Sequence, residues 1–139
     1  ELGRAIGTPL VGDPVIGANG LSHLLCPVAD VAQATPDWAA LTRYDVRTIY
    51  LWAPPVDGEL RTRMFSPIDG IFEDPATGSA AGALGIHLLQ SGVVGEGRVT
   101  MLQGVEAKRP SYIEVDVAHG APPVVGGQCA VVARGEFQL

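Results

Sequence analysis

Alternating apolar and polar residues predict several short strands along this chain. Residues 21–28 follow an Asn-Gly pair, which is a strong turn signal, and they predict the first strand. Residues 46–53 alternate in a way that predicts a mostly buried strand. Residues 59–66 predict another strand, which places Arg61 and Arg63 on one face. Three further strands are predicted over residues 98–103, 111–118 and 128–134.

A different pattern occupies residues 76–91, which are rich in alanine, glycine and leucine. No Asp, Glu, Lys or Arg occurs between positions 75 and 95, so this segment predicts a buried central helix. Gly82 and Gly85 would each cost about 1 kcal/mol relative to alanine in an exposed helix. We therefore expect neighbouring backbone to pack closely against them. The apolar part of the helix is too short and too interrupted by glycine to span a membrane.

The remaining segments complete the predicted order of elements. Residues 1–20 carry scattered glycines and prolines and predict a turn-rich lead-in. Residues 30–43 predict a helix broken near Pro36, with Thr35 as N-cap and the proline in the first helical position. The sum is an α+β fold in one domain over residues 1–139, with a mixed or antiparallel sheet curled around the central helix.

Composition and charge narrow the class of protein. The chain has 139 residues, of which 47% are hydrophobic and 17% charged, and this composition argues against a disordered protein. The net charge of −6 disfavours non-specific binding to nucleic acid or to anionic membranes. No signal peptide or transmembrane segment is visible, so we expect a cytoplasmic protein. The first residue is Glu1 and not methionine, which favours a processed, trimmed or partial chain.

The cysteines and histidines predict structural roles. Cys26 and Cys129 lie far apart and in no metal-type spacing, so both are expected to be buried apolar residues, with a disulfide or a ligand role as the alternative. No Cys/His cluster with metal-ligand spacing occurs, so no metal site is predicted. His23 could bind a ligand, although a packed or edge histidine is the favoured interpretation. His87 lies two helical turns from Ser79, too far for a Ser–His dyad, so it is also expected to be structural.

The loop before the central helix is the strongest candidate for chemistry. Pro75 pushes Asp74 towards extended geometry. Thr77, Gly78 and Ser79 then form an elbow of small residues, whose hydroxyls are suited to cap the start of a helix. Asp74 lies next to this elbow as a candidate proton carrier.

The first backbone amides of a helix lack intrahelical partners and carry partial positive charge. Because no bulky side chain guards the elbow, a carboxylate or phosphate could approach the amides of Gly78, Ser79 and Ala80. An anion pocket beside the Asp74 carboxylate suits chemistry on a small acidic molecule. Arg63 is a further candidate for binding such a ligand, with a solvated sheet face as the alternative. Asp69 is expected to support a turn.

Several motifs together resemble one known family. Residues 74–80 read Asp-Pro-Ala-Thr-Gly-Ser-Ala, with Arg-Met-Phe at 63–65 before them. Further matches are Gln103-Gly104 and the Arg-Pro-Ser run at 109–111, and the resemblance extends over about residues 21–132. The family it resembles is the phenazine-biosynthesis (PhzF-like) isomerases.

That resemblance implies the diaminopimelate-epimerase-like fold, in which two similar α+β halves face each other across the active site. Members have no metal and no organic cofactor, and the best-known one moves a proton on trans-2,3-dihydro-3-hydroxyanthranilate. By resemblance Asp74 is a catalytic helper in proton transfer and Ser79 contacts the substrate through its hydroxyl. Gly78 and Ala80 contribute backbone amides, and Thr77 belongs to the same substrate-binding elbow.

This chain resembles only the C-terminal half of the family. The main catalytic glutamate and a substrate-facing histidine of the family lie in the N-terminal half and have no matching position here; Glu1 and Glu73 do not replace them. Two hypotheses remain. The chain is an isomerase half completed by an N-terminal half, or a non-catalytic protein that binds a small acid or oligomerises. Because the cleft face would be exposed, we expect a homodimer or a heteromer.

Overall fold

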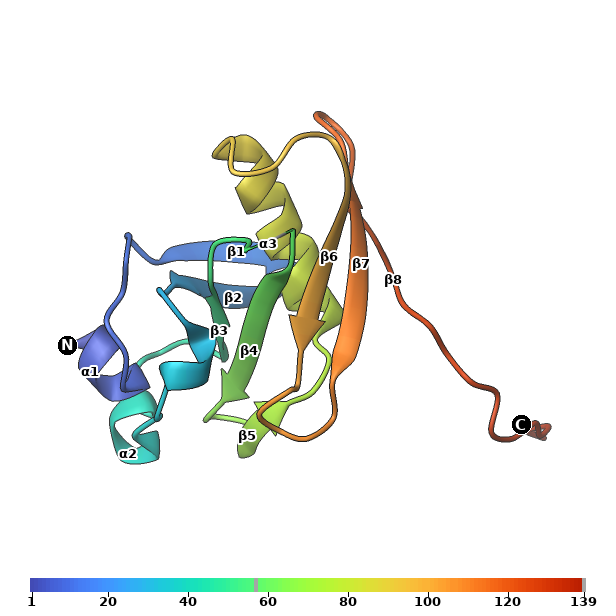
Figure 1. The fold of residues 1–139 in the computed structure, drawn as a ribbon. Helices are drawn as coiled ribbons and strands as arrows, with labels where there is room; N and C mark the ends of the chain where they lie inside the picture. The colour runs from blue at the N-terminus through green and yellow to red at the C-terminus, as the bar shows by residue number, and fades with distance from the viewer. Residues whose placement is uncertain (57, 139) are drawn as a thin grey trace.

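The computed structural model describes residues 1–56 and 58–138, and one mixed eight-stranded sheet is its framework (Figure 1). The strands are β1 (Val15–Asn19), β2 (Leu21–Pro27), β3 (Thr48–Trp52), β4 (Leu60–Ser66), β5 (Ile71–Asp74), β6 (Gly97–Gln103), β7 (Ser111–Val117) and β8 (Val124–Gly126). The helices are α1 (Leu2–Ile6), the 3-10 turn η1 (Val31–Gln33), α2 (Trp38–Leu41) and α3 (Gly78–Gln90). The strands run in the order β1-β2-β3-β4-β6-β7-β8, and β5 pairs with β4.

The sheet mixes both strand directions, as the sequence predicts. β2 pairs with β3, and β4 with β6, in parallel, whereas the other pairings are antiparallel. Parallel neighbours need a crossover connection. η1 and α2 supply the first crossover, and β5 and α3 the second. The sheet curls around α3, which occupies the place of the helix predicted at 76–91 (Figure 1). This confirms the α+β prediction.

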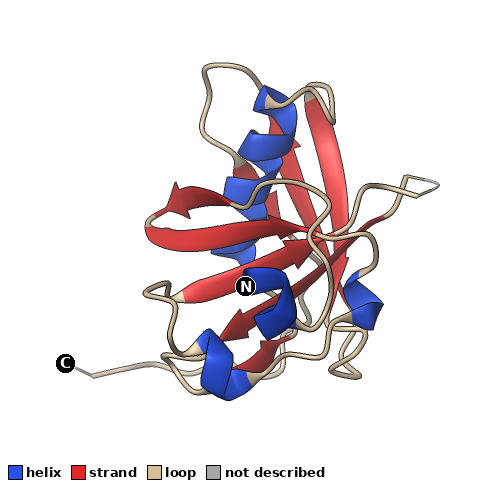
Figure 2. Ribbon diagram, turned by 90° about the vertical axis from the view of Figure 1, so that its left-hand side faces the viewer, coloured by secondary structure: helices blue, strands red, loops and turns tan. Residues whose placement is uncertain are grey.

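Two apolar clusters cover the two faces of the sheet. Tyr50 belongs to the cluster under α3, together with Leu84 and Leu88. Ile49 belongs to the cluster on the other face, together with Leu41 of α2. Figure 2 shows the long helix on one side of the strands and the short helices on the other. Because both faces are covered, every residue of β3 is buried, which confirms the predicted burial of that strand.

The strand predicted at 128–134 is wrong. β8 lies earlier, at Val124–Gly126, and the chain after it has no regular structure up to position 138. Val131 and Val132 are 76% and 94% exposed. Figure 1 shows this tail leaving the sheet and running away from the body. The apolar residues fit a strand pattern, but a strand also needs a partner edge, and the tail does not lie against one.

Two predictions for the first 43 residues also need correction. The turn-rich lead-in contains α1 and β1, and β1 forms a hairpin with β2 through the predicted turn at Gly20. α2 begins after Asp37, whose carboxylate accepts a hydrogen bond from the Ala40 amide at 3.1 Å. Thr35 and Pro36 therefore do not start this helix. An aspartate is as good an N-cap as a threonine, and here it outcompeted the Thr-Pro signal.

The glycines of α3 do allow close packing, but against side chains. A Cβ at Gly85 would lie 2.9 Å from a Val115 methyl and 3.0 Å from a Val117 methyl, both on β7. A Cβ at Gly82 would lie 2.8 Å from the Asn19 amide nitrogen. The expected backbone contact is therefore wrong. None of the helices in residues 1–56 and 58–138 has the length and apolar character needed to cross a bilayer.

Candidate functional site

The site begins where one edge of β4 is shared between two strands. The first part of β4 pairs in parallel with β6, and Thr62 lies opposite Gln103. The last part pairs with β5, and Met64 lies opposite Asp74. Asp74 and Gln103 are the final residues of their strands. They therefore meet at the fork, two residues apart along β4.

The Gln103 side chain joins the two strand ends. It is fully buried, and its Nε2 donates to the Asp74 carbonyl at 2.7 Å and to Thr77 Oγ1 at 2.9 Å. Its Oε1 accepts from the Tyr50 hydroxyl at 2.9 Å and from the Thr77 amide at 3.3 Å. Tyr50 also lies 3.1 Å from Thr62 Oγ1. A buried amide with all its donors and acceptors used is held in one orientation.

Thr77 connects this network to the Asp74 carboxylate. Thr77 is the N-cap residue of α3, but its side chain makes no cap hydrogen bond. Its hydroxyl instead donates to Asp74 Oδ2 at 2.6 Å. The predicted capping by this hydroxyl is therefore wrong. Because the Thr77 hydroxyl is bound to Asp74, it does not cap the amides of the first helical turn, which have no intrahelical partners.

The structure brings some predicted site residues together. Asp74 and Thr77 are hydrogen-bonded, and Gly78 and Ser79 follow, half-buried, in the first turn of α3. Ala80 is fully buried. Within residues 1–56 and 58–138, Ser79 Oγ makes no hydrogen bond. The roles of these residues stay predictions.

Sequence reasoning missed Gln103 and Tyr50 as parts of the site. For Gln103 the available signal was a polar side chain at the end of an apolar strand segment, because such a group needs hydrogen-bond partners when it is buried. Tyr50 and Thr62 lie within their strands, and only the structure shows that both are fully buried. Their partners lie far away in the sequence and could not be identified from it.

A groove of about 790 Å³ opens at the start of α3. Ala76 and Gly78 belong to its lining, and Tyr112 and Val125 contribute apolar surface. Neither Asp74 nor Ser79 lines it. The groove therefore reaches the helix start through the glycine and does not contain the carboxylate.

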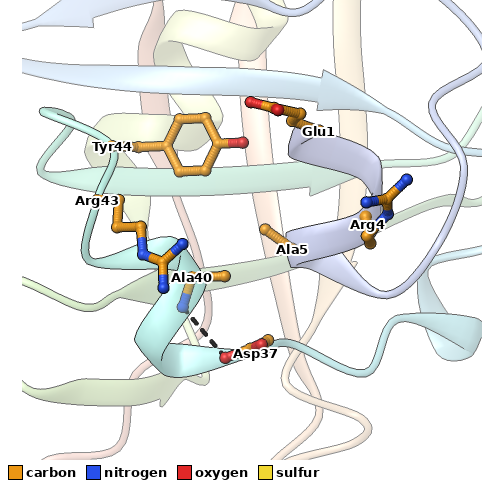
Figure 3. A pocket seen from close by; sticks show the side chains of 7 residues that line it. All are labelled: Glu1, Arg4, Ala5, Asp37, Ala40, Arg43 and Tyr44. Carbon is orange, nitrogen blue, oxygen red and sulfur yellow. Dashed lines mark hydrogen bonds between the residues drawn. The ribbon is translucent and has the colours of Figure 1, made fainter.

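A second pocket, of about 440 Å³, lies between α1 and α2 (Figure 3). Glu1 and Arg4 extend from the α1 side, and Arg43 and Tyr44 from the segment that follows α2. It contains none of the site residues predicted from the sequence.

Arg63 is a structural residue, contrary to both interpretations of it. It is 7% exposed, so it does not lie on a solvated face. Its guanidinium donates to both carboxylate oxygens of Glu73, at 3.0 and 2.8 Å. It also donates to the carbonyls of Val31 and Ala34, each at 3.0 Å, and lies over the Phe65 ring. With these donors occupied, Arg63 is not available to bind a ligand.

Asp69 supports its turn, as predicted. Ser66 donates to its carboxylate at 2.6 Å, and Arg47 forms a two-pronged ion pair with it at 2.9 and 3.1 Å. The Ser66 hydrogen bond, with the neighbouring Arg47, lowers the pKa of Asp69. These contacts tie the turn after β4 to the segment before β3.

One prediction for the cysteines is confirmed and one is wrong. Cys26 is buried, and burial raises its pKa to about 12, whereas Cys129 is exposed. His87 packs edge-on against Trp52 with ring centroids 6.2 Å apart, and its structural role stays a prediction. Among the residues that the structure describes, no three His, Cys, Asp or Glu side chains gather into a metal-type cluster.

His23 is a packed histidine, as the sequence favoured. It is fully buried, and its Nδ1 shares a hydrogen bond with Thr48 Oγ1. Its Nε2 is buried and has no partner within residues 1–56 and 58–138. Burial disfavours the charged ring and lowers the pKa of His23 below its ordinary value of 6.5.

This lowered pKa makes stability depend on pH. In acid the unfolded chain binds a proton at His23, starting near pH 6.5, whereas the folded chain does not until its lower pKa is reached. We therefore expect the free energy of unfolding to fall as the pH decreases from about 7.5 to about 5.5. Urea titrations of the wild type and of His23→Gln measure this, and the variant should show a smaller slope. His119→Gln, at an exposed position, is the control; an unchanged slope in His23→Gln would contradict the prediction.

The loop after β6 is pressed against the turn that follows Asp74. Gly104 has a φ of 78°, and a Cβ there would lie 2.4 Å from the Arg109 carbonyl oxygen and 2.7 Å from that of Pro75. Gly120 has nearly the same φ, 74°, with no atom within 4 Å. Gly120→Ala should cost about 1 kcal/mol of unfolding free energy, from its conformation alone. Gly104→Ala should cost about 3 kcal/mol, because the backbone clash adds to this. Equal midpoints in urea would refute the close contact.

Comparison with known proteins places this geometry in context. Residues 12–135 match the family model described as phenazine biosynthesis-like protein (PhzC-PhzF). The chain is 42% identical, over 118 residues, to a trans-2,3-dihydro-3-hydroxyanthranilate isomerase of Pseudomonas fluorescens. The aligned region covers 81% of this chain and 42% of that protein. The isomerase of the same name from Pseudomonas aeruginosa is 40% identical over 148 residues, which cover the whole of this chain and 53% of the relative.

Solved structures agree with these sequence matches. A predicted epimerase of Pseudomonas aeruginosa superposes with a TM-score of 0.76 and 30% identity, over 98% of this chain and 50% of that one. A PhzF-family protein of Enterococcus faecalis superposes with a TM-score of 0.74 and 26% identity, over 99% and 51%. The chain thus spans about half the length of the relatives it matches.

Proposed function

Because the chain belongs to the phenazine biosynthesis-like (PhzC-PhzF) protein family, we propose that it forms half of a cofactor-independent isomerase. The reaction would transfer a proton on a small substrate that bears a carboxylate. The observation that carries the proposal is the Asp74 carboxylate, hydrogen-bonded by Thr77 at the start of α3. In the proposal, Asp74 is the proton carrier and the first amides of α3 hold the anionic group of the substrate.

Each predicted site residue has a role in this proposal. Asp74 carries the proton. The amides of Gly78, Ser79 and Ala80 bind the substrate carboxylate together with the Ser79 hydroxyl. The substrate class comes from the relatives, whose names specify a hydroxyanthranilate derivative.

A second proton carrier has to come from another segment. Proton transfer requires both acid and base within hydrogen-bond reach of the substrate. Glu73 lies next to Asp74 in the sequence, but Arg63 occupies both of its oxygens. We propose that the missing base belongs to the half of the relatives that this chain does not cover, so the active species is a heteromer or a longer protein. The alternative is a homodimer, in which the partner is a second copy of this chain.

The test is a reconstitution. The chain alone, the uncovered half of the Pseudomonas fluorescens isomerase alone, and the two together are incubated in D₂O with trans-2,3-dihydro-3-hydroxyanthranilate. We expect isomerised product that carries deuterium only from the mixture. Saturable binding without turnover in all samples would favour a non-catalytic, small-acid-binding protein. Turnover by the chain alone would refute the need for a second half.

A further inference from the structure

We propose that Gln103 is a positioning residue for Asp74 and that, through Thr77, it makes Oδ1 the carboxylate oxygen that carries the transferred proton. The proposal rests on the function proposed above, since it assigns the proton within the same site. It starts from the contact at the β4 fork, where the buried carboxamide touches both the backbone of Asp74 and the side chain that holds its carboxylate.

The partners of Gln103 determine which end of its amide faces which way. The Asp74 carbonyl can only accept a hydrogen bond, and it lies 2.7 Å from one end. The Thr77 backbone amide can only donate, and it lies 3.3 Å from the other end. The nitrogen must therefore face Asp74 and the oxygen must face the Thr77 amide. In the reverse orientation the Gln103 oxygen would face the Asp74 carbonyl, acceptor against acceptor, and the Gln103 nitrogen would face the Thr77 amide, donor against donor.

This orientation directs the Thr77 hydroxyl proton. The hydroxyl has a single proton, and its oxygen already accepts from Gln103 Nε2 at 2.9 Å. The Thr77 proton is thus directed to Asp74 Oδ2, 2.6 Å away. Within residues 1–56 and 58–138, this is the one hydrogen bond to the Asp74 carboxylate, and it falls on Oδ2. Oδ1 is the oxygen left to exchange a proton with a substrate.

Tyr50 holds the far end of the chain of hydrogen bonds. Its hydroxyl is fully buried and donates to Gln103 Oε1 at 2.9 Å. Burial raises the pKa of Tyr50 well above its ordinary value, and the nearby Asp74 charge adds to this. The hydroxyl therefore remains a donor throughout the neutral range. Three buried side chains, Tyr50, Gln103 and Thr77, are thus linked by consecutive hydrogen bonds that end on Asp74 and give its carboxylate a defined geometry.

The first arm of the test uses turnover by the reconstituted mixture. Thr77→Val keeps the shape of the side chain and removes the donor to Oδ2, whereas Thr77→Ser keeps the hydroxyl. We expect kcat to fall about 100-fold in the valine variant, with KM changed less than about 3-fold, because the carboxylate loses its position. The serine variant should retain at least about one third of kcat. Equal kcat in the two variants would overturn the proposal, because it would show that the Thr77 hydroxyl does not affect turnover.

The second arm does not require activity, so it separates this proposal from the proposed function. Side-chain amide hydrogen exchange of Gln103 is measured by NMR on the chain itself, with the exposed Gln90 and Gln128 as internal references. We expect the Gln103 protons to exchange at least about 10-fold more slowly than the references, and Tyr50→Phe to accelerate them. Exchange as fast as at Gln128 would overturn the proposal even if the mixture is an active isomerase. Slow exchange in an inactive mixture would support the hydrogen-bond chain while the proposed function fails.

Discussion

Asp74→Asn should reduce proton transfer by the reconstituted isomerase about 1,000-fold while the fold stays intact. General acid–base catalysis contributes about 10²- to 10⁴-fold to rate, and an amide cannot carry the proton. The amide oxygen of asparagine can still accept the Thr77 hydroxyl in place of Asp74 Oδ2. The expected result is therefore a loss of kcat with an unchanged midpoint in urea. Turnover and denaturation of the same preparation measure both.

The matched control for this variant is Asp69→Asn. Asp69 is also an aspartate that accepts a hydroxyl hydrogen bond, from Ser66, but it lies in the turn after β4. We expect its substitution to leave kcat within about 3-fold of the wild type. In the proposed function Ser79 contacts the substrate and carries no proton, so Ser79→Ala should mainly raise KM. Wild-type turnover by Asp74→Asn would rule out Asp74 as the proton carrier.

Arg63→Ala should lower the free energy of unfolding by about 3–5 kcal/mol. Breaking a buried ion pair from one side leaves the other charge without compensation. Here the Glu73 carboxylate would lose both of its guanidinium hydrogen bonds, and its side chain is only 15% exposed. The carbonyls of Val31 and Ala34 would lose their donor as well. Urea denaturation of the wild type and the variant measures the difference.

Arg47→Ala is the matched control for Arg63→Ala, because it breaks an ion pair that is exposed to solvent. Arg47 also forms a two-pronged pair with a carboxylate, that of Asp69, but its side chain is 56% exposed. Solvent-exposed pairs contribute between 0 and about 1 kcal/mol, so this variant should be nearly as stable as the wild type. Arg63→Ala with a similarly small loss would show that the buried pair does not stabilise the fold.

The elements that were predictable from the sequence are those whose burial follows from their own residue composition. α3 was located correctly because a long uncharged segment has to be inside. β3 was recognised because residues 46–53 are mostly apolar, with Arg47 as their one charged residue, and such a segment suits a strand covered on both faces. The Asp74–Thr77 proximity also follows from local geometry, since the two residues are three positions apart.

What could not be predicted depends on distant partners. Alternation correctly placed Arg61 and Arg63 on one face of β4, yet it could not show that the carbonyls of Val31 and Ala34 cover that face. The Gln103 contacts reach residues 26 to 53 positions away in the sequence. The tail at 128–134 has a strand pattern but no edge to join, and pairing is a property of the whole sheet.

The fork on β4 has a consequence for the folding pathway. β6 can join the free part of the β4 edge only after the chain has passed through β5 and α3, so the loop between the paired strands is long. Non-local parallel pairings of this kind are slow to form, because loop closure comes before the contacts that compensate it. The Asp74–Gln103 junction should therefore form after the folding transition state. Substitutions at Gln103 would then speed unfolding and leave the refolding rate unchanged.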